Sequence, residues 1–424
     1  MVPRLRPRLG PAEVAALAPS RGDDVGAFET AFAATMHQRN AVAFPYGRTG
    51  LVALLQALDI RDREVICPAY TCVVVPHAIV ASGNEPVFVD SSDHDFNMDL
   101  SLVEAAITPR TSAIVATSIF GYPVDLDQLD AIRRQHPTVA IIQDCAHSFG
   151  ARWRGREVQR AGIAAVFGLN VSKLLTSIFG GMITTDDDEL AARIRGWRSA
   201  HVAPAGIAKS ARRALYLLAT MPAFWGPLYG IVNRLERMRV LDHFVRYYDD
   251  HVIDMPKDYL TGLSPVEARV GRAQTARYQR IVNDRRAVAA SYDRALRGLR
   301  GLRLPPLVDG ATYSHYVPRV ADRAAVMEHC RRRGVQLGEI IEYSIPELAA
   351  YRDRPGNRFP CPVSRELSRT TINLPCHMPH GRVTTVSRAL EQSIIAAPRW
   401  CSSARRTSTE APSRPSDPGR TIAG

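Results

Sequence analysis

Lysine is scarce in this sequence. Lysine and arginine together number 54, yet only Lys173, Lys209 and Lys257 are lysines. Arginine cannot form a Schiff base, whereas lysine can once burial or a neighbour lowers its pKa and frees the amine. If the protein forms an imine through a side-chain amine, only these three lysines are therefore candidates.

Several other common signals are missing. The seven cysteines show neither a CxxC pair nor regular spacing, which favours a reduced, cytoplasmic protein and predicts no metal site. The basic N-terminus has no apolar segment of the kind found in secretory signals. No GxGxxG follows the first strand, which excludes a dinucleotide-binding Rossmann enzyme. The net charge of +12 is spread over scattered arginines rather than a stripe, so no nucleic-acid partner is expected.

The length and the pattern of the chain indicate a multidomain α/β protein. A chain of 424 residues exceeds the roughly 250–300 residues at which single cores stop growing. Apolar strands alternate with amphipathic helices, which predicts a mainly parallel sheet covered on both faces. The expected strands are 64–68, 86–90, 113–118, 139–144, 164–169 and 182–185, and the expected helices are 73–82, 102–106 and 126–135.

Two chemical groups follow strands of this predicted sheet. Lys173 lies in a short polar turn between the apolar run 164–169 and the glycine pair Gly180-Gly181. Asp144 directly follows the apolar run 139–142. Sites in such sheets lie beyond the carboxyl ends of the strands. Lys173 is therefore either a reactive amine or a lysine that extends from a strand end to solvent, and Asp144 is either a helix N-cap or a functional partner.

A glycine-bearing turn precedes the second helix of the chain. Residues 46–50 read Tyr-Gly-Arg-Thr-Gly, and a turn of this kind at a helix N-terminus offers free backbone N–H groups and the positive end of the helix dipole. Both suit a phosphate, and Arg48 adds positive charge. The alternative is that the glycines only cap the helix.

A series of motifs then occurs in a recognisable order. They are FETAF (28–32), GRTGL (47–51), EVICPAYTC (64–72), EPVFVD (85–90), NMD (97–99), ITPRTSAIVATSIFGYPVDLDQL (107–129), IIQDCAHSFGA (141–151), the Lys173 segment with GGMITTDD (180–187), and INLPCHMP (372–379). Over residues 10–395 the chain resembles the DegT/DnrJ/EryC1/StrS aminotransferases. These are pyridoxal 5'-phosphate (PLP) enzymes of fold type I that typically aminate nucleotide-linked keto-sugars.

The resemblance assigns roles to particular residues. It implies that Lys173 is the Schiff-base lysine and that Asp144 pairs with the pyridinium nitrogen of PLP. A protonated ring nitrogen makes the cofactor an electron sink, and the lysine amine moves the proton. His147 falls where the family places a Gln or His near the 3-hydroxyl of the cofactor, with a surface or N-cap histidine as the alternative. Arg48 and Thr49 occupy the positions of the family's phosphate-binding turn.

Three departures from the family pattern affect the cofactor site. Cys72 stands where the family usually has an aromatic ring that stacks on the cofactor, so stacking passes to Tyr70 or is lost. Gly168 stands where the family keeps a phosphate-binding Ser, and Asn170 or Ser172 is the candidate substitute. The later segment that usually sends an Asn across the dimer interface reads Tyr-Leu-Thr-Gly-Leu-Ser at 259–264 and lacks that Asn.

The resemblance also implies a fold, a function and partners. We expect a large PLP-binding domain over 1–265 with a seven-stranded, mainly parallel sheet, a smaller C-terminal α+β domain over 266–397 that opens with one long helix (265–296), and a disordered tail over 398–424. The expected function is amino transfer from glutamate or glutamine to a keto-sugar, nucleotide-linked, in a cytoplasmic homodimer. The alternatives are a cyclitol or other ketone as acceptor, a dehydratase, or a non-catalytic ligand-binding relative. The family's sugar dehydratases replace the lysine by histidine, and Lys173 argues against that branch.

An insert over about 203–250 exceeds the linker that the family usually has there. Its segment 214–235 is long and apolar, is interrupted by Pro222, Gly226, Pro227 and Gly230, and is flanked by arginines. The interruptions argue against a membrane span. Two interpretations remain: short helices packed on the protein or its dimer partner, and a surface that makes weak contact with a membrane.

Overall fold

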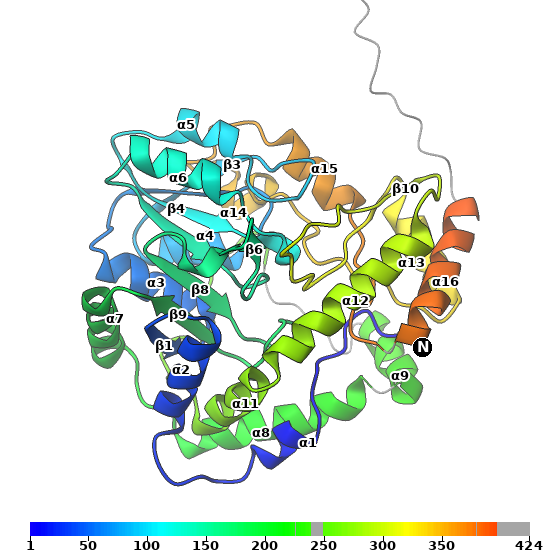
Figure 1. Cartoon of the computed structure of the whole chain (residues 1–424), viewed down its shortest axis with the longest axis horizontal. Helices are drawn as coiled ribbons and strands as arrows, with labels where there is room; N and C mark the ends of the chain where they lie inside the picture. The colour runs from blue at the N-terminus through cyan, green and yellow to red at the C-terminus, as the bar shows by residue number, and fades with distance from the viewer. Residues whose placement is uncertain (225, 239–248, 379, 397–424) are drawn as a thin grey trace, which may run out of the picture.

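The fold is described from a computed structural model that covers residues 1–224, 226–238, 249–378 and 380–396 (Figure 1). The predicted tail over 398–424 therefore lies outside the described residues. The strands are β1 (Asn40–Phe44), β2 (Glu64–Pro68), β3 (Glu85–Val89), β4 (Thr111–Thr117), β5 (Ala140–Asp144), β6 (Arg152–Trp153), β7 (Arg156–Glu157), β8 (Ala164–Gly168), β9 (Gly181–Thr185), β10 (Leu302–Arg303) and β11 (Arg319–Val320).

Helices connect and cover these strands. The α-helices are α1 (Pro11–Ala15), α2 (Asp24–Thr35), α3 (Gly47–Ala57), α4 (Val74–Ala81), α5 (Val103–Ala106), α6 (Leu126–Gln135), α7 (Asp188–His201), α8 (Ile207–Ala223), α9 (Gly226–Arg237), α11 (Pro265–Thr275), α12 (Tyr278–Leu296), α13 (Arg323–Arg332), α14 (Ala349–Arg352), α15 (Pro362–Thr370) and α16 (Val383–Ala396). Short 3₁₀ turns are η1 (Leu100–Leu102), η2 (Ile119–Gly121), η3 (Val158–Arg160), η4 (Ile345–Glu347) and η5 (His380–Arg382).

The central sheet has seven strands in the order β1-β9-β8-β5-β4-β2-β3. Its strands run parallel except β9, which is antiparallel to both β8 and β1. Parallel neighbours need a crossover, whereas an antiparallel return needs only a loop. The loop between β8 and β9 contains Lys173, so the reversal of β9 places this lysine at the carboxyl end of β8. The predicted seven-stranded, mainly parallel sheet is confirmed.

Alternating side chains of each strand enter two hydrophobic clusters, one on each face of the sheet. In β1, Val42 and Phe44 join one cluster while Ala41 and Ala43 join the other. The first cluster also takes residues of α3, α4 and α7, and the second takes residues of α2, α5 and α6. This is the burial on both faces that the continuous apolar runs predict. The first cluster continues into α12, α13 and α16, so it joins the sheet to the C-terminal part of the chain.

The long helix predicted over 265–296 is wrong, because the structure has α11 and α12 with a break between them. Arg277 leaves the helical conformation at φ −112° and ψ 6°, and its guanidinium forms an ion pair with the buried carboxylate of Glu13. This ion pair ties the break between the two helices to α1. In Figure 1, α12 runs diagonally from α11 toward the C-terminal helices. The domain boundary at 265/266 stays a prediction.

The insert forms two helices, α8 and α9, at the periphery of the molecule (Figure 1). Residues 225 and 239–248 of the insert lie outside the described part of the chain. Among the described residues, no helix is both long enough and apolar enough to span a membrane. The insert therefore adds a peripheral layer next to α11.

Candidate active site

Asp144 is the last residue of β5, at the carboxyl edge of the sheet, and its side chain is buried. One carboxylate oxygen accepts a hydrogen bond from the Thr117 hydroxyl at 3.1 Å, and the other accepts one from the Ala146 amide at 3.0 Å. Burial raises the pKa of the carboxyl, while the Ala146 amide, the charge of Lys173 and the Thr117 hydroxyl lower it. The residues that follow form a turn rather than a helix, so Asp144 is not a helix N-cap.

Lys173 lies in the loop between β8 and β9, which is fixed by its own hydrogen bonds. The Lys173 amide donates to the Asn170 carbonyl at 3.0 Å, and the Ser177 amide donates to the Leu169 carbonyl at 2.9 Å. The next two side chains, Leu174 and Leu175, are fully buried and anchor the loop. The stem of the lysine crosses the end of β8, since a Cβ added to Gly168 would lie 3.4 Å from the Lys173 Cε.

The lysine amine has charged and titratable neighbours from three other segments. Burial lowers its pKa, and electrostatic interactions with Cys72 and Asp144 act in the opposite direction. Cys72 also interacts with Arg48, whose pKa burial lowers. The structure therefore brings Arg48, Cys72, Asp144 and Lys173 together, although they span 125 residues of the sequence between Arg48 and Lys173. A lowered amine pKa increases the fraction of neutral, nucleophilic amine.

His147 is buried beside this amine and is therefore not a surface histidine. Its Nδ1 accepts a hydrogen bond from the Phe120 amide at 3.2 Å, and its ring stacks on the Phe120 ring at 5.9 Å. Burial, followed by the charges of Lys173 and His315, lowers its pKa well below the ordinary value. A neutral ring whose Nδ1 accepts carries its proton on Nε2. The hydrogen bond thus selects one tautomer of His147.

His315 is a site residue that the sequence reasoning missed. Its buried ring lies 5.0 Å from the His147 ring, and its Nδ1 lies 3.0 Å from the Ser314 hydroxyl oxygen. Burial and the charges of Arg285 and Lys173 lower its pKa. The only signal in the sequence was a polar pair, Ser314-His315, directly before an apolar stretch. Nothing in the sequence connects this pair with His147, which lies 168 residues earlier in the turn after β5.

The N-terminus of α3 lies against the lysine loop. A Cβ on Gly47 would lie 3.1 Å from the Phe167 carbonyl oxygen, and a Cβ on Gly181 would lie 2.3 Å from the Gly47 nitrogen. These glycines therefore let the helix start approach the ends of β8 and β9. The first amide N–H groups of a helix have no acceptor within the helix, so this corner can bind an anion. The guanidinium of the half-buried Arg48 stands in the same turn, 3.5 Å from the Asp254 carbonyl oxygen.

The other predicted cofactor residues already have partners within the chain. The buried Thr49 hydroxyl donates to the Tyr259 carbonyl at 3.0 Å. The Tyr70 hydroxyl lies 2.9 Å from the Thr371 hydroxyl, on the contact with the C-terminal part of the chain. Asn170 and Ser172 bond to each other, since Asn170 Oδ1 accepts from both the amide and the hydroxyl of Ser172. Their roles toward a cofactor stay predictions.

A buried charge network behind α3 was also missed. The Tyr46 hydroxyl donates to Asp258 at 2.6 Å, and Arg213 of α8 reaches the other Asp258 oxygen at 2.9 Å. Arg213 also forms an ion pair at 2.9 Å with Glu267, which is fully buried. Burial and Asp258 raise the pKa of Tyr46 to about 12. The insert thus anchors the residue that precedes the first turn of α3.

The fold and the site together define a class. The central sheet has seven mostly parallel strands. Lys173 lies in the loop after β8, and the buried carboxylate of Asp144 lies at the end of β5, the neighbouring strand in the sheet. This is the arrangement of fold type I PLP enzymes. The chain belongs to the DegT/DnrJ/EryC1/StrS aminotransferase family, whose sequence profile matches residues 14–220 and 233–391.

Three relatives illustrate the likeness. GDP-perosamine synthase of Caulobacter vibrioides is 38% identical over 169 residues, which cover 40% of this chain and 45% of that protein. The match thus spans less than half the length of this curated relative. The solved structure of S. venezuelae DesV is 25% identical, covers 90% of this chain and 94% of its own, and has a TM-score of 0.71. PseC of Helicobacter pylori, at 18% identity, a TM-score of 0.74 and coverage of 93% and 100%, shows the shared fold.

The residues present fit PLP. The site contains one lysine with a lowered pKa, a buried carboxylate at the correct strand end, and a helix N-terminus with an arginine for the phosphate. Asp144 has an amide and a hydroxyl as its protein partners, which leaves carboxylate lone pairs for a ring N–H. Among the described residues, no group of three or more His, Cys, Asp or Glu side chains could hold a metal ion.

Proposed function

We propose that this chain is a PLP-dependent aminotransferase that transfers an amino group from glutamate or glutamine to a nucleotide-linked keto-sugar. The observation that carries the proposal is the Lys173 amine, whose pKa burial lowers and which interacts with Asp144 and Cys72. Membership of the aminotransferase family supports the reaction, and the name of the perosamine relative supports a sugar carried on a nucleotide. We further propose that the protein is a homodimer in the cytoplasm.

Each residue has a separate task. When bound, PLP supplies the electron sink for a carbanion next to nitrogen. Lys173 would bind the cofactor covalently and then carry the proton that moves during amino transfer. Asp144 would keep the ring nitrogen protonated, while Arg48 and the first amides of α3 would hold the phosphate. The Nε2 proton of His147 is available for a hydrogen bond to the ring oxygen of the cofactor.

Reductive labelling tests the assignment of Lys173. The purified protein is incubated with PLP, reduced with borohydride, digested and mapped, and we expect the pyridoxyl group on Lys173. Lys209 is the internal control, because its amine donates to the Thr261 and Gly262 carbonyls at 2.6 and 2.9 Å. A label on Lys209 or on the exposed Lys257, or no cofactor uptake, would overturn the proposal.

A substrate screen tests the rest of the reaction. Keto-sugars on different nucleotides are combined with glutamate, glutamine and other donors, and the products are identified by mass spectrometry. We expect an amino-sugar nucleotide with glutamate or glutamine only. A free cyclitol or another ketone as the sole acceptor would contradict the proposed acceptor while leaving the role of Lys173 intact. Loss of water without a gain of nitrogen would indicate a dehydratase.

A further inference from the structure

Helix α8 has the reverse of the usual distribution of side chains. Its inward face is largely polar, with Lys209, Arg213 and Thr220 buried beside Leu217. Its outward face is apolar: Ile207 is 89% exposed, Leu215 68% and Leu218 47%. A helix on the surface of a globular protein normally points its apolar stripe at the core. Ion pairs hold the inward side, so the apolar stripe of α8 faces away from the protein.

Helix α9 also exposes apolar side chains. Leu228, Ile231 and, directly after the helix, Met238 are exposed. Together with Tyr216 of α8, residues 207–238 hold seven of the twelve large hydrophobic side chains that are exposed in the described part of the chain. Isolated exposed apolar residues need no explanation, whereas such a concentration marks an interaction surface. We call Ile207, Leu215, Leu218, Leu228, Ile231 and Met238 the outer apolar residues.

Positive charge prevails in this region. Residues 207–238 contain five lysines and arginines and one acidic residue, Glu236. Arg212 is 64% exposed next to the outer apolar residues of α8, and Arg234 is exposed on α9. Apolar side chains combined with exposed arginines are what interfacial helices present to anionic lipid. A basic, apolar surface therefore matches an anionic membrane in both respects.

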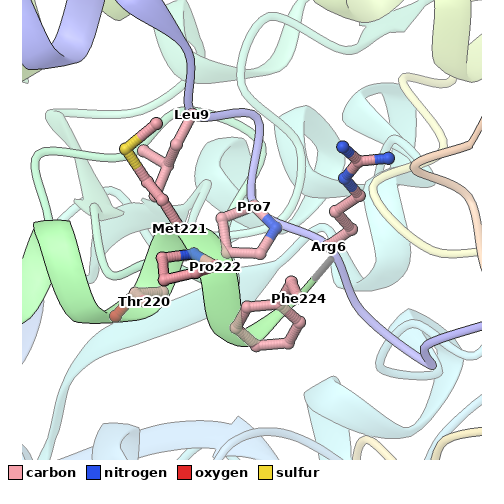
Figure 2. Close-up of a pocket in the computed structure, with 7 residues that line it drawn as sticks. All are labelled: Arg6, Pro7, Leu9, Thr220, Met221, Pro222 and Phe224. Carbon is pink, nitrogen blue, oxygen red and sulfur yellow. The ribbon is translucent and has the colours of Figure 1, made fainter. Parts of the chain in front are cut away.

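A pocket at the end of α8 also combines apolar side chains with an arginine. It has a volume of about 270 Å³ and lies between α8 and the N-terminal segment. Figure 2 shows Pro7, Pro222 and Phe224 gathered on one side, with the guanidinium of Arg6 extending away from them. Arg6 is exposed. An apolar pocket with one cation beside it suits a lipid, which joins a phosphate to an acyl chain.

We propose that the outer apolar residues of α8 and α9 bind this protein to the surface of an anionic lipid membrane. A second copy of the chain fits this surface less well. In a two-fold interface the same patch meets itself, so Arg212 and Arg234 of one copy would face the like charges of the other. The contact is interfacial, because α8 has only 17 residues, Pro222 lies inside it, and no described helix can span a membrane.

Two aromatic residues of the insert, Tyr229 and Trp225, are left out of the proposed contact. Tyr229 is buried, and its hydroxyl bonds to Gln336. Trp225 lies outside the described residues. The proposal therefore rests on the outer apolar residues and on the exposed arginines, which offer different substitutions for a test.

Vesicle flotation tests the proposal with the full-length, PLP-loaded protein. Vesicles contain either phosphatidylcholine alone or phosphatidylcholine and phosphatidylglycerol in equal amounts. We expect flotation with the phosphatidylglycerol vesicles at low ionic strength and release at high salt. Leu215→Glu combined with Leu218→Glu should weaken partition at least about tenfold, since it puts two carboxylates into the contact. Leu102→Glu combined with Leu307→Glu, at similarly exposed leucines outside the insert, should leave it unchanged.

Further measurements distinguish the other outcomes. Arg234→Glu should weaken partition without placing a charge among the leucines, which keeps the test valid if the double leucine variant does not fold. Light scattering reports the mass of each variant. Failure of the folded wild type to float, or equal flotation on both vesicle types, would overturn the proposal. A halved mass of the leucine variant with unchanged flotation would show that a second copy covers this surface.

Discussion

The positions of Asp144 and Lys173 at the carboxyl edge of the sheet could be predicted from the sequence, because Asp144 ends one apolar run and Lys173 lies in the turn after another. The carboxyl ends of neighbouring parallel strands lie at the same edge of the sheet, so residues at these ends lie close together. The structure places the two groups close enough to shift each other's pKa. His315 could not be identified in this way. It belongs to a segment without a long strand, and only the packing of the C-terminal part on the sheet brings it to His147.

Replacing Asp144 by Asn keeps the size of the side chain and removes its charge. We expect PLP uptake to persist and the turnover number to fall by about 10²–10⁴, because an unpaired pyridine nitrogen is a poor electron sink and a buried charge partner is worth several kcal/mol. Cofactor absorbance and steady-state kinetics measure the two effects separately.

Thr117→Val is the matched control for Asp144→Asn. It removes one hydrogen bond to the same carboxylate, worth about 1 kcal/mol, so turnover should fall by less than about tenfold. Wild-type turnover in the Asn variant would remove Asp144 from the mechanism. Equal losses in both variants would point to a role of the carboxylate in folding.

Regular helices and strands followed from the sequence pattern, whereas the orientation of α8 did not. The predicted bounds of α6 agree with the structure at both ends, since Asp125 caps the helix and apolar residues recur on its inner side. In α8, three ion pairs to Asp258 and one to Glu267 decide which side is buried. The helical periodicity of a sequence does not reveal ion-pair partners that lie 45 to 54 residues away along the chain.

Arg213→Ala should destabilise the protein by about 3 kcal/mol, because it leaves the buried carboxylate of Glu267 without its cation. Because Arg213 also holds Asp258 and Tyr46, the affinity for PLP should fall as well. Urea unfolding measures the first effect and a cofactor titration the second. Arg212 also contacts Asp258, but its side chain is 64% exposed. Arg212→Ala should therefore lower the free energy of unfolding by less than about 1 kcal/mol. Similar losses for the two variants would argue against the anchoring role.

Burial of histidines makes the stability of the whole protein depend on pH. His77, His147 and His315 are buried and His377 is half-buried, and burial lowers the pKa of each. For His77 the value falls to about 4. An unfolded histidine binds a proton below a pH of about 6.5, whereas folded His77 stays neutral down to a pH of about 4. Stability is therefore fully present above a pH of about 6.5 and is lost as the pH falls toward 4.

His77→Phe should reduce this loss, because phenylalanine cannot bind a proton and keeps a ring against Tyr351. Melting temperatures between pH 7 and pH 4 measure the effect, and His77 alone accounts for up to about 3 kcal/mol of it. His94→Phe, at an exposed histidine, should leave the slope unchanged. A slope in His77→Phe as steep as in the wild type would contradict the assignment.

The reversal of β9 also determines when the sheet can be completed during synthesis. Strand β1 lies at the edge of the sheet and pairs with β9, with Asn40 opposite Thr185 and Phe44 opposite Gly181. At about 5–20 residues per second, a ribosome needs roughly 7–30 s to make the intervening chain. For that time the nascent strand Asn40–Phe44 has no partner in the sheet, and it is apolar enough to join another chain. The lysine loop closes last, so a chaperone that covers β1 in this interval would raise the yield of protein competent to bind its cofactor.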